Sequence, residues 1–316
     1  MVERQQRSAT ASLPLASRAD AGGGNYSVAS RGAATTVNAM TVDVEDYFQV
    51  QAFANHIDRA SWDSHDCRVE RNTEVVLALF AEAGAKGTFF TLGWVAERYP
   101  ALIRRIVDEG HELASHGFEH IRADSQSPDE FRADIGKTKD LLEQTAGIAV
   151  DGYRAATFSI GPDNQWAYEV LAEEGYRYSS SIYPVRHDLY GMPDAPREPH
   201  YPRGRDGVVE LPMTTLRLGS RNLPCSGGGY FRLLPYPVSR WQMRHVNRHD
   251  KAPCIFYFHP WEVDPAQPRQ TGIGLKTRVR HYVGLNRMQG RLHLLLRDFR
   301  WGPMRDVFAE VLGAAA

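Results

Sequence analysis

Short apolar runs alternate with longer amphipathic segments along this chain from about residue 37 onward. The apolar runs predict β-strands over residues 37–44, 87–92, 112–115 and 255–258. The amphipathic segments predict helices over residues 74–83, 100–107, 128–145 and 167–174. The third helix has a clear start signal, since Ser127 can cap it, Pro128 follows the cap and Glu130 comes three residues after the cap. Repeated strand-then-helix order is typical of parallel strands covered by helices, in an open doubly wound sheet or in a barrel.

Polar residues follow several of the expected strands. Three acids, Asp43, Glu45 and Asp46, stand at the end of the first strand, and the end of the last strand carries His259. The carboxyl ends of parallel strands meet at one face of a barrel, where active sites collect, so this recurrence favours a barrel over an open sheet. One carboxylate and two histidines are a common ligand set of a catalytic metal, and a second carboxylate and a third histidine would supply a base and an acid. The sequence therefore predicts a metal-dependent hydrolase.

The acids of the first strand are expected to point in a definite direction. Side chains alternate along a strand, so Met40 and Val42 share a face suited to packing under helices, while Asp43 and Glu45 share the other face. On this interpretation the two acids point into the mouth of the barrel. The alternative is that the acids form a solvated turn or cap the next element.

A histidine pair follows the third strand. His116 and His120 stand four residues apart, which would place both rings on one face of a helix, about one turn apart, as suits two ligands of one metal. The alternative is a capped loop with hydrogen-bonded histidines. Ligation is favoured because this pair, like the acids, stands at the exit of a strand.

The composition indicates an ordinary globular protein. Its 316 residues are 42% hydrophobic and 24% charged, and they are consistent with one large domain behind an N-terminal tail. The formal net charge of -1 gives no global attraction to nucleic acid, so any electrostatic recognition must be local. Three widely spaced cysteines argue against a disulfide framework or a zinc knuckle. Reduced thiols fit a cytoplasmic protein.

Residues 1–36 are expected to form a disordered tail. They are rich in Ser, Ala, Arg and Gly and contain no apolar run long enough for a signal peptide or a membrane span. A solvated tail is the favoured interpretation, and an organelle transit peptide is the alternative. Nothing in the remaining chain reaches the ~18 apolar residues of a spanning helix, so no integral membrane segment is expected. The protein is expected in the cytoplasm or at the membrane periphery.

Four motifs resemble, in order and spacing, those of NodB-type polysaccharide deacetylases, carbohydrate esterase family four. They are Thr41-Val-Asp43 together with the acids Glu45 and Asp46 that follow it, Ser115-His-Gly-Phe-Glu-His120, Gly152-Tyr-Arg-Ala155 and Phe258-His259. The resemblance covers residues 37–262. Residues 40–48 and 259–265 resemble more narrowly the branch found with exosortase and exopolysaccharide gene clusters, which carries an extra C-terminal segment.

This resemblance implies a fold, an activity and a cofactor. The fold would be a single α/β domain, a deformed (β/α) barrel over residues 37–262, with a helical extension over residues 263–316 packed on it. The activity would be metal-dependent removal of N-acetyl groups from amino sugars of an exopolysaccharide or its precursor, so the expected partner is an N-acetylated amino-sugar polymer or oligosaccharide. Zn²⁺ is the expected divalent metal, because three protein ligands leave positions open for water and substrate, as in catalytic zinc sites.

The resemblance also implies roles for individual residues. By position, Asp43 would be the general base, His116 and His120 metal ligands, Arg154 the brace of Asp43, and His259 the acid that protonates the leaving amine.

The motifs depart from the family pattern in several places. Most members have two adjacent aspartates, whereas this chain inserts Val44, so both Glu45 and Asp46 stay open as the metal acid. The alternation of side chains along the strand favours Glu45. Asp46, in contrast, has the same short side chain as the aspartate of the family. The acid that usually orients the catalytic histidine is missing from residues 178–181, and Glu210 is the hypothesised substitute.

These departures leave two other functions open. One is an allantoinase-like hydrolase of small amides, and the other is a carbohydrate-binding protein that kept the fold and lost turnover.

Two further segments have simple structural interpretations. Residues 227–229 predict a flexible or close-packed loop rather than a phosphate loop. The arginines and lysine of residues 276–300 predict a solvated helix face, with a surface for an anionic polysaccharide or a lipid-linked pyrophosphate as the alternative.

Overall fold

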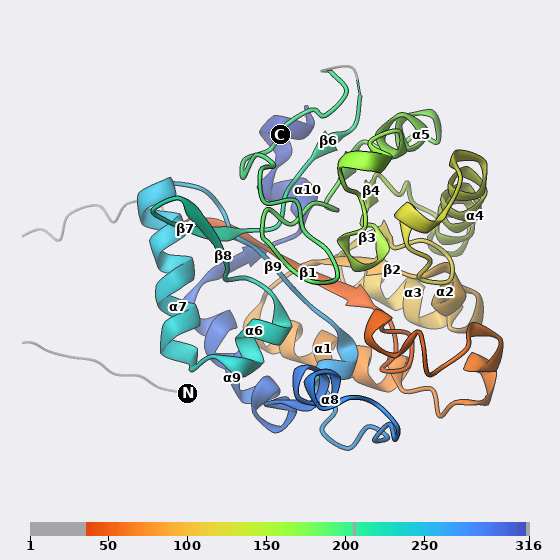
Figure 1. Cartoon of the computed structure of the whole chain (residues 1–316), viewed down its shortest axis with the longest axis horizontal. Coiled ribbons are helices and arrows are strands. Elements are labelled where there is room, and N and C mark those ends of the chain that lie inside the picture. The colour runs from red at the N-terminus through yellow and green to blue at the C-terminus, as the bar shows by residue number, and fades with distance from the viewer. Residues whose placement is uncertain (1–35, 205–206, 314–316) are drawn as a thin grey trace, which may run out of the picture. The chain divides into compact units, whose positions relative to one another are not determined.

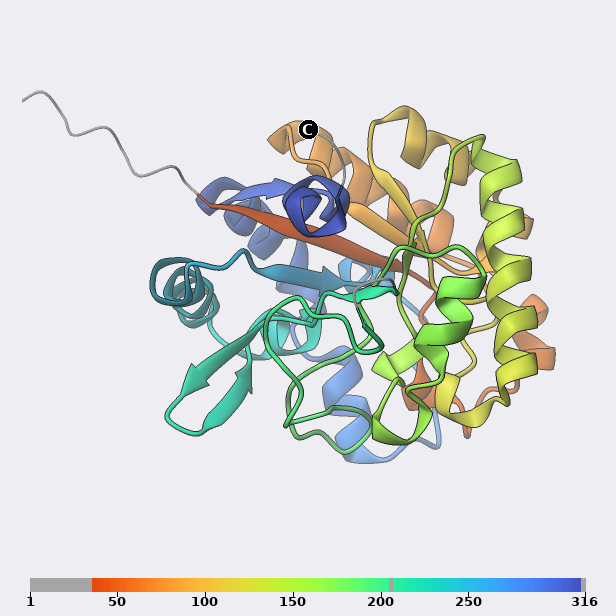
Figure 2. The ribbon, with the colours of Figure 1, turned by 90° about the horizontal axis from the view of Figure 1, so that it is seen from above.

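The computed structural model describes residues 36–204 and 207–313. A compact unit begins at Thr36. The N-terminal tail expected over residues 1–36 lies, apart from Thr36, outside the described residues. Within the compact unit most of the strands gather in one curled sheet, and helices lie along its outer side (Figures 1 and 2).

The main sheet has eight strands, and all of its strand pairings are parallel. The strands are β1 (Val37–Val44), β2 (Thr88–Thr91), β3 (Glu112–Ser115), β4 (Gly152–Tyr153), β5 (Tyr178–Ser179), β6 (Val209–Glu210), β9 (Ile255–Phe258) and β10 (Arg300–Gly302). Strands β1 to β6 follow one another across the sheet, and β9 and β10 both pair with β1. The predicted bounds of β1, β3 and β9 are confirmed, whereas β2 is one residue shorter at each end than predicted.

The described residues form eleven α-helices, several of which cover the outer side of this sheet. They are α1 (Val69–Ala83), α2 (Gly93–Arg98), α3 (Pro100–Asp108), α4 (Pro128–Ala146), α5 (Ala167–Glu173), α6 (Gly228–Leu233), α7 (Tyr236–His245), α8 (Leu275–Tyr282), α9 (Leu285–Asp298), α10 (Met304–Val307) and α11 (Ala309–Leu312). The predicted start of α4 is confirmed: the Ser127 hydroxyl accepts the Glu130 N–H, and the Glu130 carboxylate accepts the Ser127 N–H. Helix α1 begins five residues earlier than predicted. Within the described chain, no helix is long and apolar enough to cross a membrane.

The C-terminal segment, expected as a helical extension over residues 263–316, contains helices α8 to α11 and in addition one strand of the main sheet. Strand β10 joins the sheet by pairing with residues Val37–Ala39 of β1. Helix α10 then lies against the first residues of two strands, since the Met304 N–H donates to Thr88 Oγ1 at 2.8 Å and the Arg305 N–H donates to Glu112 Oε2 at 3.0 Å. These bonds satisfy a buried carboxylate at the amino-terminal end of the barrel, opposite the ends that carry the polar motifs.

A loop segment continues the sheet beyond β9. The Tyr257 N–H donates to the carbonyl of Ser226 at 2.9 Å, and Gly227 forms a parallel bridge with Tyr257. A Cβ atom at position 227 would lie 2.6 Å from the Tyr257 ring, so the close approach requires glycine. This part of the predicted loop is therefore close-packed. A separate antiparallel hairpin, β7 (Thr215–Leu218) with β8 (Arg221–Pro224), precedes it.

Candidate active site

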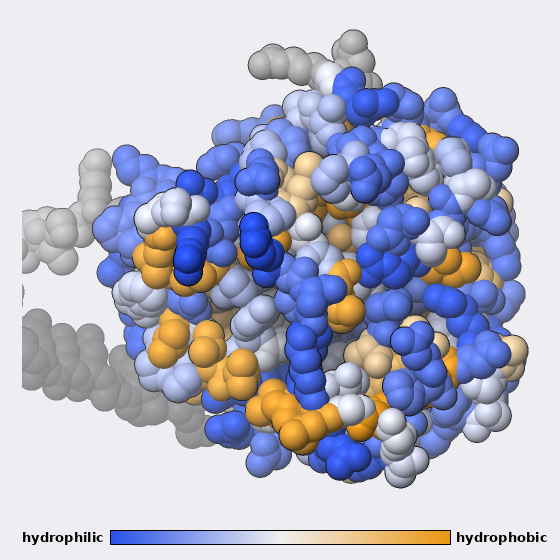
Figure 3. All heavy atoms as spheres, in the orientation of Figure 1, coloured by the Kyte–Doolittle hydropathy of each residue, from blue (hydrophilic) through white to orange (hydrophobic). Residues whose placement is uncertain are grey.

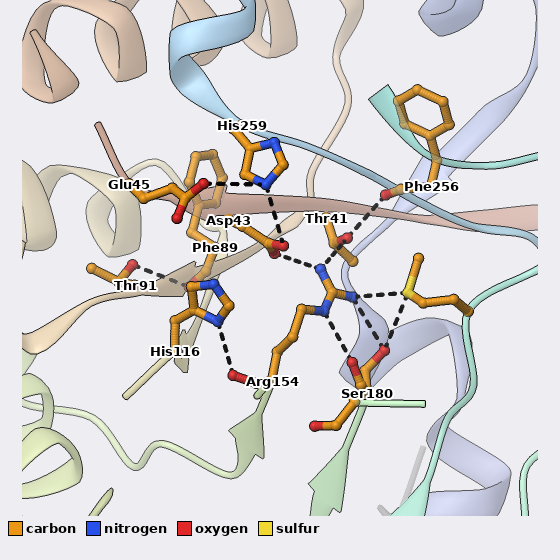
Figure 4. A network of polar contacts seen from close by, with 12 residues as sticks. Thr41, Asp43, Glu45, Phe89, Thr91, His116, Arg154, Ser180, Phe256 and His259 are labelled. Carbon is orange, nitrogen blue, oxygen red and sulfur yellow. Dashed lines mark hydrogen bonds and ion pairs between the residues drawn. The ribbon is translucent and has the colours of Figure 1, made fainter. Parts of the chain in front are cut away.

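Polar residues from four strands meet at the carboxyl-terminal end of the sheet. Asp43 and Glu45 come from the end of β1, His116 follows β3, Arg154 follows β4 and His259 follows β9 (Figure 4). A pocket of about 660 Å³ opens over them, and all of these residues except Arg154 line it. The structure therefore places these residues at the mouth of the barrel, and strand alternation aims Asp43 and Glu45 into the same space.

Three of the residues form a group that can hold a metal ion. Glu45, His116 and His120 each offer one ligand atom, and these atoms all lie within 4.8 Å of one another. Glu45 Oε2 lies 3.1 Å from His120 Nε2 and has no hydrogen-bond partner among the described residues. A buried carboxylate oxygen left without a donor costs free energy, which a bound cation would remove. The donor set of two imidazoles and one carboxylate fits Zn²⁺ and other first-row divalent ions.

The protonation of the two histidines suits ligation. Burial lowers the pKa of His116, and burial together with the neighbouring His116 ring lowers the pKa of His120 well below its usual value. Both rings are therefore neutral near pH 7, which is the form that binds metals. The Nδ1 atom of His116 donates to the carbonyl of Arg154 at 2.8 Å, so its Nε2 lone pair is free to face the ion. Burial raises the pKa of Glu45 to about 7, although the nearby His259 ring acts in the opposite direction.

The histidine pair does not lie on a helix, and that part of the prediction is wrong. Residues 116–120 form a loop in which Gly117 and His120 both have positive φ, at 76° and 53°. The loop is held against the start of α2, where the N–H groups of Gly93 and Trp94 donate to the carbonyls of Gly117 and Phe118. Because the loop folds back, the rings of His116 and His120 still come within 5.2 Å of each other, measured between centroids.

Asp46 lies outside this group and has another structural role. Its Oδ1 atom accepts the N–H of Tyr47, and its Oδ2 atom accepts the N–H groups of Arg68 and Val69. Arg68 is the N-cap residue of α1 and Val69 is its first residue, so Asp46 caps this helix from a distant part of the chain. This remote cap accounts for the start of α1 at Val69, ahead of the apolar periodicity that placed the start at residue 74.

We expect Asp46→Ala to lower stability while leaving metal binding intact. The substitution would leave the buried N–H groups of Arg68 and Val69 without their acceptor, which should lower the free energy of unfolding by about 2 kcal/mol. Urea denaturation and elemental analysis would measure the two properties. Asp66→Ala is the control, because Asp66 is exposed and its loss should change stability by less than about 0.5 kcal/mol. Loss of metal in Asp46→Ala would contradict the assignment of Glu45 to the metal group.

Asp43 is held by a fully buried arginine. The Nη1 atom of Arg154 donates to Asp43 Oδ1 at 2.5 Å and to Thr41 Oγ1 at 2.8 Å. The rest of the guanidinium donates to the carbonyl and hydroxyl of Ser180 (Figure 4). Its central carbon also lies over the Phe90 ring, 4.0 Å from the ring centroid. Arg154 is 0% exposed, so this cation has to be paired. The arrangement fixes one oxygen of Asp43 and leaves the other, Oδ2, facing His259 at 4.0 Å from Nε2.

His259 is oriented by an acid three residues later in the chain. Glu262 Oε1 accepts the Nδ1–H of His259 at 2.8 Å and also its backbone N–H. Burial opposes protonation of His259, but the carboxylates of Glu45, Glu262 and Asp43 outweigh it and raise its pKa to about 9. His259 is therefore a protonated imidazolium near neutral pH, with its Nε2–H directed toward Glu45 and Asp43.

The hypothesis that Glu210 orients His259 is wrong. Glu210 accepts the N–H groups of Ser181 and Ile182 and the hydroxyl of Tyr168, so it fixes the strand exit that carries Ser180 rather than the histidine. Sequence reasoning missed Glu262 because it looked for an acid on another strand. The signal was the spacing of His259, Pro260 and Glu262, which is that of a capping box.

A second buried arginine completes this arrangement. Arg232 Nε donates to Glu262 Oε2 at 2.6 Å, and the guanidinium also donates to the carbonyls of His281 and Val283. Burial would raise the pKa of Glu262, but Arg232 and His259 outweigh this effect and lower it to about 2. A Cβ atom at position 228 would lie 2.2 Å from Glu262 Oε1, so Gly228 is required for this packing. Nothing in the sequence alone distinguished Arg232 from the other arginines.

Trp261 contacts both His259 and Glu45, the carboxylate of the metal group. Its ring stacks on His259, with 5.2 Å between centroids, and on His281, with 4.3 Å. Its Nε1–H points at Glu45 Oε1 from 3.4 Å. Trp261 is 5% exposed, so it is a wall of the pocket rather than an open platform for a sugar ring.

Two family models match most of this chain. Residues 59–179 match a model described as polysaccharide deacetylase, and residues 180–309 match one described as a domain of unknown function (DUF3473). The chain carries a polysaccharide deacetylase domain of the NodB type. Of the candidate site residues, His116, His120 and Arg154 lie in the first matched segment, and His259 lies in the second.

Curated relatives align with part of the chain. A peptidoglycan-N-acetylglucosamine deacetylase of Bacillus cereus is 36% identical over 77 residues, which are 24% of this chain and 28% of that protein. A chitooligosaccharide deacetylase of Azorhizobium caulinodans is 28% identical over 100 residues, 31% of this chain and 45% of that protein. The chain therefore spans less than half of either relative.

A solved structure shares the fold over nearly its whole length. It is a crystal structure from Mycobacterium smegmatis assigned to the polysaccharide deacetylases, with a TM-score of 0.58 and 20% identity, and the match covers 88% of this chain and 91% of that one. The predicted fold class, a deformed (β/α) barrel of the deacetylase kind, is confirmed.

Proposed function

We propose that this protein is a metal-dependent hydrolase that removes N-acetyl groups from the amino sugars of an exopolysaccharide or its precursor. The observation that carries the proposal is the placement of Glu45, His116 and His120 in one pocket, beside a carboxylate and an imidazolium. The deacetylase domain and the relatives named for peptidoglycan and chitooligosaccharide deacetylation support it. The choice of an exopolysaccharide as the substrate is based on the resemblance of residues 40–48 and 259–265 to the branch found with exopolysaccharide gene clusters.

Glu45, His116 and His120 would hold the divalent ion, and Zn²⁺ suits this donor set. When bound, it would supply Lewis acidity to the amide carbonyl and to water. Asp46 would take no part, because backbone N–H groups occupy both of its oxygens.

Asp43 and His259 would move the protons. Asp43 accepts a proton from the attacking water through Oδ2, while Arg154 keeps the carboxylate in place through Oδ1. A C–O bond forms to the acetyl carbon, and the C–N bond then breaks as the Nε2–H of His259 passes its proton to the leaving nitrogen. The products are acetate and the free amino sugar.

Acetate release tests this proposal. The purified protein would be stripped with a chelator, reloaded with Zn²⁺ and incubated with N-acetylglucosamine oligomers, and the acetate and the free amines would be measured together. We expect equal amounts of both products from the reloaded protein and neither from the stripped protein. Binding of the oligomers without acetate would indicate a carbohydrate-binding protein instead, and release from small cyclic amides alone would indicate allantoinase-like chemistry.

We expect Glu262→Gln to shift the alkaline limb of the pH–rate profile to lower pH. Glu262 is one of the carboxylates that raise the pKa of His259 to about 9, so removing its charge lowers this pKa and His259 loses its proton at a lower pH. A metal held by Glu45 would offset the charge of that carboxylate, so Glu262 and Asp43 would then be the main causes of the raised pKa of His259. Turnover at neutral pH should fall by about 10-fold, because the imidazole also loses its anchor.

The profile would be measured with saturating oligomer from pH 5 to 10. Glu82→Gln, at an exposed position of α1, is the control and should leave the profile unchanged. An alkaline limb that stays in place in Glu262→Gln would show that another group donates the proton.

A further inference from the structure

The mouth of the active-site pocket has an exposed apolar rim. We define this apolar rim as Leu189, Leu233, Leu275 and Val279, which all line the pocket. They are also 37%, 54%, 76% and 51% exposed, respectively. Figure 3 shows hydrophobic side chains gathered over α6 and α8 on the face that is viewed. Clustered exposed aliphatic side chains at a pocket mouth are typical of a docking surface.

Helix α8 presents its apolar residues outward. Leu275 and Val279 are four residues apart, so they share one face of the helix, and that face is exposed. Lys276, Arg278 and Arg280 stand beside them in the same eight residues, and His281 is the residue of α8 that is buried. An exposed apolar face flanked by basic residues is typical of helices that lie on a membrane surface.

The rim has a net positive charge. Residues 186–190 and 275–282, which form its two sides, contain four basic residues, Arg186, Lys276, Arg278 and Arg280, against the single carboxylate of Asp188. Asp188 bridges the two sides, since it pairs with Lys276 at 2.6 Å and with Arg280 at 3.0 Å. The bridge holds both sides together and leaves Arg186 and Arg278 exposed.

We propose that the apolar rim docks this protein on the surface of an anionic lipid bilayer. Leu275 and Val279 then enter the interface, the basic side chains contact the lipid phosphates, and the active-site pocket opens toward the bilayer. Charge decides between this partner and a second copy of the chain. Two copies meeting through the rim would bring like charges together, whereas an anionic bilayer offers the opposite sign along with an apolar interior.

Vesicle sedimentation with the full chain tests the proposal. We expect binding to vesicles of phosphatidylcholine with one quarter phosphatidylglycerol, and at least ~10-fold weaker binding to phosphatidylcholine alone. The variant Leu275→Ser/Val279→Ser should bind the anionic vesicles at least ~10-fold more weakly than the wild type. The control is Val238→Ser/Trp241→Ser, at two exposed apolar positions on α7 outside the rim, and it should bind like the wild type.

Three results would overturn the proposal. They are no binding of the wild type to anionic vesicles, an equal loss of vesicle binding in both double variants, or a dimer in the absence of lipid that Leu275→Ser/Val279→Ser converts to monomers. Light scattering after gel filtration measures the last, and thermal unfolding shows that the variants are folded. Arg278→Glu adds a charge test that leaves the apolar side chains in place, with weaker binding to anionic vesicles expected. All of these measurements need neither metal nor substrate, so they stand apart from the proposed deacetylation.

Discussion

The double variant His116→Ala/His120→Ala should contain no stoichiometric metal and release no acetate above the chelated background. The substitution leaves one carboxylate, Glu45, of the three groups whose ligand atoms lie within 4.8 Å of one another. A single carboxylate in a pocket cannot hold Zn²⁺ against dialysis, and without the ion the amide loses its Lewis acid. We therefore expect turnover to fall by at least ~10³-fold.

Elemental analysis after dialysis against metal-free buffer measures the loss directly. The matched control is His245→Ala/His249→Ala, a second pair of histidines four residues apart, which lies on α7 and on the π-helical segment Val246–Asp250 that follows it. That variant should keep one metal ion per chain and full turnover. Stoichiometric metal in His116→Ala/His120→Ala would mean that the ion binds elsewhere in the chain.

The sequence predicted the barrel and most of the candidate site because both depend on local regularities. The period of two in residues 37–44 aimed Asp43 and Glu45 to one side, and the structure places both in the pocket. Strand ends could be located from apolar runs, so residues at four strand exits were brought to one face by topology alone. Where the prediction used helical spacing, for His116 and His120, it gave the correct proximity for the wrong reason.

The parts that sequence reasoning missed depend on contacts between distant residues. Asp46 caps α1 across 23 residues of chain, and Arg232 reaches Glu262 across 30. Neither contact leaves a periodic signal, since an acid or an arginine in a loop is compatible with many partners. The polar spacing of His259 and Glu262 was visible, but an acid on a neighbouring strand was an equally acceptable partner until the fold was known.

The segment that matches a domain of unknown function contributes directly to the candidate site. Residues 180–309 include His259, its partner Glu262 and the buried Arg232 that pairs with Glu262. The same segment adds β9 and β10 to the sheet beside β1, which carries Asp43. Because β9 and β10 pair with β1 and Glu262 orients His259, both matched segments contribute to one sheet and to one candidate site.

The variant Asp43→Asn should keep its metal and lose turnover by ~10²-fold or more, the low end expected for a general base. Asparagine has nearly the same shape and can still accept the Arg154 N–H through Oδ1, but its amide cannot take a proton from water. Because the buried Arg154 loses its counterion, we also expect the free energy of unfolding to fall by about 3 kcal/mol. Urea denaturation measures this cost separately, so a folded sample can be assayed well below the transition.

Metal content distinguishes this role of Asp43 from that of its neighbour. Glu45→Gln removes the carboxylate that belongs to the metal group, and it should lower metal affinity, whereas Asp43→Asn should leave affinity within about 10-fold of the wild type. Parallel titrations of both variants with Zn²⁺ therefore give opposite results if the two acids have different functions. A shared loss of metal would make Asp43 a ligand, and the base would then have to be sought among the other groups that line the pocket.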